Sequence, residues 1–264
     1  AAKFRAARRM YARIMRDRFG ASDASSRMRF HTQTGGVTLT AQQPLNNVVR
    51  VTVQALAAAL GGTQSLHTNG YDEALALPTA EAATLALRTQ QIVAHESGVA
   101  KTVDPLAGSY YVEALTDELE RQATLLIAKA DELGGSEDAI AAGFFQDEIA
   151  RSAYEHQLRV ESGAITVVGV NRFTDDEPPP AIPTPDFSQL EAEQVRSLKG
   201  VRSKREAKAA SQSLAALKTG AAALLGSETD APAVMPLIID AVRARCSVGE
   251  IASALQSEWG SYTP

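Results

Sequence analysis

Residues 27–62 read RMRFHTQTGGVTLTAQQPLNNVVRVTVQALAAALGG, and they contain signals for a strand, a polar loop and a helix in that order. The strand is predicted over 27–31, and the loop after it is rich in Thr, Gln and Gly. Pro44 suits the first turn of a helix, because its missing N–H has no partner there in any case. Gly61 and Gly62 end that helix. This stretch is therefore predicted to form one strand–helix unit.

Two further units follow with the same layout. The second has a strand over 64–69 and a helix that Thr79 caps. The third has a strand over 101–104 and a helix that Thr116 is expected to cap before Gly134 ends it. Repeated units of this kind predict an α/β protein with a parallel sheet, which is either an open doubly wound sheet or part of an eight-stranded barrel.

The composition changes after a last apolar strand, which is predicted over 165–170 and preceded by helices over 137–142 and 146–160. Residues 175–186 contain five prolines and four acids, a composition typical of an extended linker. Helices are predicted over 187–225 and 232–259, with a restart at the capping-box pair Ser247 and Glu250. We therefore expect a barrel-type domain over 1–174, a linker over 175–186 and a helical arm over 187–264.

Charge and cysteine content exclude several classes of function. The net charge is -5 and basic residues are scattered among acids, so no nucleic-acid-binding stripe is indicated. No apolar run approaches the roughly 18 residues that a membrane span needs. Cys246 is the only cysteine, which excludes an internal disulfide and a multi-cysteine metal site and favours the cytoplasm.

The first predicted helix, over 2–18, is unusually basic. Its arginines are expected to form a solvated face or to contact an anionic cofactor tail or a neighbouring subunit. The chain also opens inside this helix, without an initiator Met or an N-cap. We therefore expect a fragment, a truncation or a split gene product.

Two histidines stand out as candidates for chemistry, since His31 and His67 each end a predicted strand. A polar residue at the carboxyl end of a barrel strand is placed to face a substrate, although a structural, hydrogen-bonded role fits the same position. A metal site is the rival interpretation, but neither histidine has a further ligand at suitable spacing. No Gly-x-Ser-x-Gly turn supports a serine nucleophile. The residues alone indicate a parallel α/β scaffold with a polar cluster at its strand ends.

Several motifs, taken in their order along the chain, carry a resemblance to a known family. They are Arg29-Phe30-His31-Thr32-Gln33-Thr34-Gly35-Gly36, Asn46-Asn47-Val48-Val49-Arg50, Gly61-Gly62-Thr63-Gln64-Ser65-Leu66-His67-Thr68-Asn69, Asp72-Glu73-Ala74-Leu75, Val168-Gly169-Val170-Asn171 and, near the end, Arg243-Ala244-Arg245. In this order they resemble the methylmalonyl-CoA mutase family, over essentially the whole chain. The resemblance implies the carboxy-terminal portion of a (β/α)8 TIM barrel, followed by the linker and the helical arm.

The family resemblance also implies a reaction and a cofactor. It predicts a radical carbon-skeleton rearrangement of an acyl-CoA that depends on adenosylcobalamin. His31 matches the active-site histidine and is expected to hydrogen-bond the thioester carbonyl inside a closed, water-poor cavity. Gln33 is expected to line the same mouth, and Asn69, Gly70, Tyr71 and Asp72 to bind the acyl-CoA substrate. No residue is expected to bind a metal ion.

Missing parts of the family pattern predict partners. The upstream half of the barrel does not occur in this sequence, and neither does the Asp-x-His-x-x-Gly motif that carries the lower cobalamin ligand. We therefore expect a hetero-oligomer with an upstream barrel segment and a cobalamin-binding small subunit or domain from another chain.

The acyl group and two other functions remain open at this point. Phe30, Gly36 and Val37 favour an isobutyryl-CoA or 2-hydroxyisobutyryl-CoA mutase over the methylmalonyl type. The alternative function is a non-catalytic assembly or scaffold subunit, which would dock a mutase through its basic first helix and its helical arm. A barrel with ordinary acid–base chemistry is the third interpretation, and it predicts activity without cobalamin.

Overall fold

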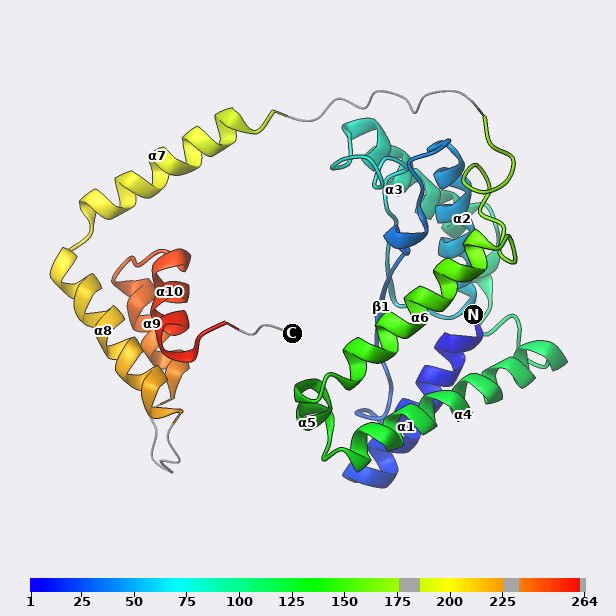
Figure 1. The fold of residues 1–264 in the computed structure, drawn as a ribbon, viewed down its shortest axis with the longest axis horizontal. Helices are drawn as coiled ribbons and strands as arrows, with labels where there is room; N and C mark the ends of the chain where they lie inside the picture. Colours follow the sequence, from blue (N-terminus) through cyan, green and yellow to red (C-terminus); the bar gives the residue numbers. More distant parts are fainter. Residues whose placement is uncertain (176–185, 226–232, 262–264) are drawn as a thin grey trace. The chain divides into compact units, whose positions relative to one another are not determined.

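Helices dominate the computed structural model, which describes residues 1–175, 186–225 and 233–261 (Figure 1). The chain divides into two compact units, Ala1–Pro185 and Asp186–Pro264. The predicted linker over 175–186 lies outside the described residues except for its two ends. The domain boundaries therefore stay a prediction.

The first unit combines helices with one small sheet, which confirms the α/β class. In chain order it contains α1 (Ala2–Phe19), β1 (His31–Gln33), the 3-10 helix η1 (Gly36–Thr38), α2 (Asn46–Leu60), β2 (Ser65–His67), α3 (Ala80–His95), the 3-10 helix η2 (Val99–Lys101), α4 (Tyr110–Glu132), α5 (Ser136–Ala141) and α6 (Phe144–Glu161). Helix α2 connects the two strands. They pair in parallel, with His31 opposite Ser65 and Gln33 opposite His67.

The prediction that His31 ends its strand was wrong, because β1 begins at His31. The Phe30 amide donates to the side-chain oxygen of Gln64 at 2.9 Å, and Arg27 closes a turn on the Ala24 carbonyl. The Phe30 carbonyl accepts from the Gln64 amide at 3.4 Å, so Phe30 contacts the segment before β2 although the strand itself begins one residue later. His67 does end β2, as predicted.

Two other predicted strands are absent from the described residues. In place of a strand over 101–104 the chain forms η2 and then a left-handed turn residue, Asp104, with φ 45°. Residues 165–170 form a tight loop around Asn171, whose amide nitrogen donates to the Val160 and Ile165 carbonyls at 2.8 Å each. No strand among the described residues pairs with this apolar run, and Asn171 binds some of its backbone groups instead.

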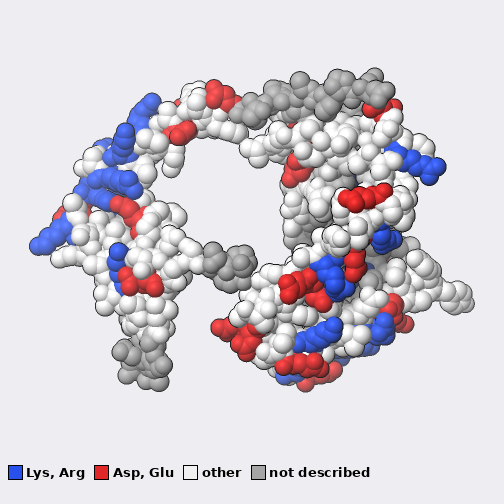
Figure 2. All heavy atoms as spheres, viewed as in Figure 1, with Lys and Arg blue, Asp and Glu red and all other residues white. Residues whose placement is uncertain are grey.

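Helix α1 packs along α4, and ion pairs connect the two helices. Arg5 binds Asp104 at 3.0 Å and Glu113 at 2.7 Å, and Arg9, Arg13 and Arg18 bind α4 carboxylates further along. Figure 2 shows basic and acidic side chains interleaved over this part of the molecule. Much of the basic face of α1 is therefore matched to acids of the same chain.

Thr116 does not cap a helix, so that prediction was wrong. Helix α4 begins at Tyr110, and Thr116 lies inside it, buried against α1. Its hydroxyl donates to the Val112 carbonyl at 2.6 Å and accepts from Arg5 at 3.1 Å. The Thr116 hydroxyl forms hydrogen bonds as a capping side chain does, but its two partners lie on α4 and α1.

Helix boundaries with local signals agree well with the sequence. Thr79 caps α3 through the Ala82 amide, as predicted. Helix α2 begins at Asn46, two residues after Pro44, and ends at Leu60 before the glycines. No helix among the described residues has the length and apolar character of a membrane span.

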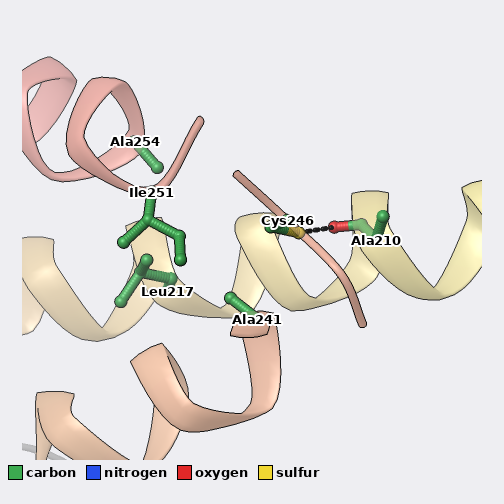
Figure 3. Close-up of a cluster of buried hydrophobic side chains, with 6 residues drawn as sticks. All are labelled: Ala210, Leu217, Ala241, Cys246, Ile251 and Ala254. Carbon is green, nitrogen blue, oxygen red and sulfur yellow. Dashed lines mark hydrogen bonds between the residues drawn. The ribbon is translucent and has the colours of Figure 1, made fainter. Parts of the chain in front are cut away.

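The second unit consists of α7 (Ser188–Lys204), α8 (Ala207–Ala223), α9 (Val234–Arg243) and α10 (Val248–Trp259). Helices α8, α9 and α10 enclose a cluster of buried side chains, shown in Figure 3: Ala210, Leu217, Ala241, Cys246, Ile251 and Ala254. Ser247 and Glu250 form the predicted capping box at the start of α10. Glu250 also binds Arg205 at 2.6 Å, which ties the segment before α8 to α10.

Candidate functional site

One face of the small sheet collects the polar side chains that the sequence singled out. Side chains alternate along a strand, so the parallel register places His31, Gln33, Ser65 and His67 on the same face. All four are exposed. We call this set the open face.

The opposite face of the sheet is buried against helices. Thr34 and Thr68, which follow the two strands, are 4% and 3% exposed. The Thr68 hydroxyl donates to the Ala86 carbonyl of α3 at 2.7 Å. Because α3 covers this side, the open face points away from the helical layer.

His31 contacts a neighbour on the paired strand. Its Nδ1 lies within hydrogen-bond distance of the Ser65 hydroxyl, and these two residues are directly opposite in the register. Its Nε2 has no hydrogen bond to any residue that the structure describes. The imidazole is exposed within this chain, and the closed cavity, which was predicted to include protein from outside this sequence, stays a prediction.

Gln33 connects the open face to a buried amide. Its Nε2 donates to Oδ1 of Asn69 at 3.0 Å, and the Asn69 backbone amide donates to the Thr34 hydroxyl at 3.0 Å. Asn69 is 2% exposed, yet its Nδ2 has no hydrogen-bond partner among the described residues. A buried donor without a partner costs free energy, so this amide is suited to a ligand or water that supplies an acceptor.

Gly36 lies beside that free amide. A Cβ added at Gly36 would be 3.0 Å from Asn69 Nδ2 and 3.7 Å from the Glu73 side chain. A side chain at Gly36 would therefore crowd the Asn69 amide, and glycine leaves room for it.

Asp72 lies elsewhere, away from the open face. Its side chain is fully buried, and Oδ2 accepts from the Thr79 amide at 2.8 Å at the start of α3. A Cβ on Gly70 would be only 2.6 Å from Oδ1, so Gly70 leaves room for this carboxylate. The structure thus gives Asp72 contacts that hold the loop onto α3.

Tyr71, between Gly70 and Asp72 in the chain, is half-buried. Burial raises the pKa of its hydroxyl, and the charges of Glu81 and Asp72 raise it further. Its carbonyl accepts from Nδ2 of Asn47 at 2.9 Å, and Asn47 is itself fully buried. The predicted substrate-binding loop is therefore anchored on both α2 and α3.

Sequence reasoning missed Ser65 and Asn47. The signal for Ser65 was present, because it lies two residues before His67 and so shares its face of the strand. Asn47 belongs to the motif Asn46-Asn47-Val48-Val49-Arg50, but no role was predicted for it. Three of its four hydrogen bonds are to the nearby Thr40 and Arg50, and the fourth reaches Tyr71, 24 residues further along the chain.

A groove of about 560 Å³ lies on another side of α2, and none of the predicted site residues lines it. Val49, Arg50 and Val53 of α2 form one wall, and the loop that includes Val168 forms another. Arg50 closes this contact by donating to the Val168 carbonyl at 2.6 Å. The described residues include no group of three or more His, Cys, Asp or Glu side chains that could hold a metal ion.

Comparison with known proteins assigns this chain to a family. The family model described as methylmalonyl-CoA mutase matches residues 1–261. The chain belongs to the methylmalonyl-CoA mutase family.

Individual relatives agree with this assignment. The 2-hydroxyisobutanoyl-CoA mutase large subunit of Aquincola tertiaricarbonis is 47% identical over 263 residues, covering 99% of this chain and 46% of the relative. Methylmalonyl-CoA mutase of Rhizobium meliloti is 43% identical over 265 residues, covering 100% and 36%. The mitochondrial methylmalonyl-CoA mutase of Homo sapiens is 40% identical over 263 residues, covering 99% and 34%. The chain thus spans less than half the length of these relatives.

Proposed function

We propose that this chain forms part of the catalytic subunit of an adenosylcobalamin-dependent acyl-CoA mutase. The reaction would be a radical carbon-skeleton rearrangement of a short branched acyl-CoA. The observation that carries the proposal is the open face, where His31 and Gln33 lie on one side of β1 and the Nε2 of His31 has no hydrogen bond to any described residue. Family membership supports the same chemistry.

The proposed role of His31 is to donate a hydrogen bond from Nε2 to the thioester carbonyl. Charge builds up on that oxygen as the acyl radical rearranges, and a preorganised donor stabilises it. The Ser65 contact restrains the ring on its Nδ1 side, so Nε2 is the nitrogen that remains for a ligand. Gln33 is restrained in the same way by Asn69.

The residues around the open face fit a large polar cofactor. Asn69 offers a buried amide donor that has no hydrogen-bond partner among the described residues, and a side chain at Gly36 would crowd it. Adenosylcobalamin, when bound, would supply the radical that removes hydrogen from the substrate. Asn69 would contribute an amide contact, and His31 would donate a hydrogen bond to the thioester carbonyl. The sheet would exclude water on one side of the site.

The open face needs further protein to become a closed site. Two strands with an exposed polar face cannot exclude water from a reactive species. We propose that the chain is the carboxy-terminal portion of a (β/α)8 barrel, completed by an upstream barrel segment. A cobalamin-binding small subunit or domain would complete the hetero-oligomer, and the single free thiol of Cys246 supports the cytoplasm as its compartment.

The proposed substrate is isobutyryl-CoA or 2-hydroxyisobutyryl-CoA, with methylmalonyl-CoA as the competing choice. The 47% identity to a 2-hydroxyisobutanoyl-CoA mutase large subunit supports this order over the 40–43% identities to methylmalonyl-CoA mutases. Turnover of the three acyl-CoA thioesters by the reconstituted complex decides between them. The scaffold alternative loses part of its docking surface, because arginines of α1 bind acids of α4.

Replacement of His31 tests the proposed function. His31→Ala in the complex reconstituted with cobalamin is expected to lower kcat about 100-fold or more, as the loss of one preorganised donor does in other enzymes. His156→Ala, at an exposed position of α6, is the matched control and should leave kcat unchanged. Equal turnover of the His31→Ala variant and the wild type would refute the role of His31. Activity without cobalamin would favour acid–base chemistry.

A further inference from the structure

We infer that Ser65 is a positioning residue for His31, whose hydroxyl donates to Nδ1 and so presents Nε2–H toward the acyl carbonyl. This inference rests on the proposed function. Its direct support is the contact between Ser65 Oγ and His31 Nδ1, made by two residues that face each other across the strand pair.

The direction of this hydrogen bond follows from what each atom has available. A neutral imidazole carries one N–H and one acceptor nitrogen, and a serine hydroxyl can donate or accept. Because Nδ1 of His31 faces Ser65, the proposed donor to the acyl carbonyl is Nε2, which must therefore carry the proton. In the neutral ring, Nδ1 is then an acceptor. The Ser65 hydroxyl has no other hydrogen-bond partner in the parts of the chain that the structure describes, so its proton is free for Nδ1.

Ser65 is itself held in place through its backbone. Its carbonyl accepts from the Thr63 hydroxyl at 2.8 Å, and that hydroxyl in turn accepts from the hydroxyl of Thr32 at 2.8 Å. Thr32 belongs to β1, so this chain of bonds joins the strands beside the His31 contact. The ring is therefore oriented by the sheet.

A double-mutant cycle tests the inference in the reconstituted complex. Ser65→Ala is expected to lower kcat about fivefold with little change in KM, the loss typical of one hydrogen bond. Ser65→Thr keeps the hydroxyl and should restore most of the activity. In the His31→Ala background, Ser65→Ala should have no further effect. An equal loss in both backgrounds, or no loss in the wild-type background, would overturn the inference.

A spectroscopic readout separates this inference from the proposed function. With 15N-histidine in the full chain, the His31 signals, assigned from His31→Ala, should show protonated Nε2 and a hydrogen-bonded, unprotonated Nδ1. The Nδ1 signal should move in Ser65→Ala and recover in Ser65→Thr. A protonated Nδ1 in the wild type overturns the Ser65 assignment alone. Unchanged turnover of His31→Ala overturns the proposed function, and with it the catalytic use of this contact.

Discussion

The two units of this chain are stabilised in different ways. In the second unit, helices α8, α9 and α10 surround an apolar cluster with Leu217 fully buried. In the first unit the fully buried side chains include Asn47 and Asp72, and one face of the sheet is exposed. The second unit is built around one apolar cluster, whereas the first combines buried apolar side chains such as Val51 with buried polar groups that hold loops beside a site. That contrast predicts which substitutions affect stability and which affect function.

The largest stability effect is expected at Leu217. Leu217→Ala removes buried methyl groups and leaves a cavity, so it should lower the free energy of unfolding by about 2–5 kcal/mol. Denaturant unfolding monitored by circular dichroism measures this loss. Leu225→Ala is the control in the same unit, because that side chain is 66% exposed, and it should change stability little. Similar effects for the two leucines would contradict the contrast between the units.

A smaller effect is expected at Asn47 in the first unit. Its Oδ1 accepts from the Thr40 amide at 3.1 Å, and its Nδ2 donates to the Thr40 and Tyr71 carbonyls at 2.9 Å each. Asn47→Ala leaves these groups without partners and should destabilise the unit by about 1–3 kcal/mol. Hydrogen exchange should rise mainly in the loop around Tyr71. Asn46→Ala, which loses one side-chain hydrogen bond to Gln43, is the matched control. Unchanged exchange near Tyr71 would show that Asn47 does not anchor this loop.

Helix ends could be predicted from the sequence because their signals are local. Thr79 and the Ser247–Glu250 pair each cap a helix within three residues. Strands depend on partners elsewhere in the chain, and apolar character alone does not provide one. The predicted strand over 165–170 did not form for that reason: no described strand lies beside it, and Asn171 binds part of its backbone.

The candidate site could be predicted only in part for the same physical reason. His31 and His67 were recognised, and alternation along the strands places them on one face. The contact between His31 and Ser65 depends on the register between two strands, which no local pattern specifies. The pairing of the α1 arginines with α4 acids likewise joins residues about a hundred positions apart. From composition alone, the helix over 2–18 could be recognised only as basic.

The smallest effect is expected at the ion pairs between α1 and α4, and it depends on pH. Hydrogen bonds from Arg5 and from the Gly108 amide lower the pKa of Glu113 to about 2, below its ordinary value of 4.5. A depressed pKa means that the carboxylate stabilises the folded state above about pH 4.5, and that this contribution is lost as pH falls toward 2. Glu113→Gln should therefore lower the Tm slightly at pH 7, and the difference from the wild type should shrink toward zero by about pH 2.

The control for this prediction is Glu132→Gln, at an exposed position on the last turn of the same helix. It should leave the Tm near the wild-type value throughout the same pH range. A Glu113→Gln difference that stays constant with pH would show that the carboxylate charge does not hold α1 against α4. The stabilisation would then have to come from the packing between the helices and from the hydrogen bond that Arg5 donates to the buried Thr116 hydroxyl at 3.1 Å, because that hydroxyl carries no charge to titrate.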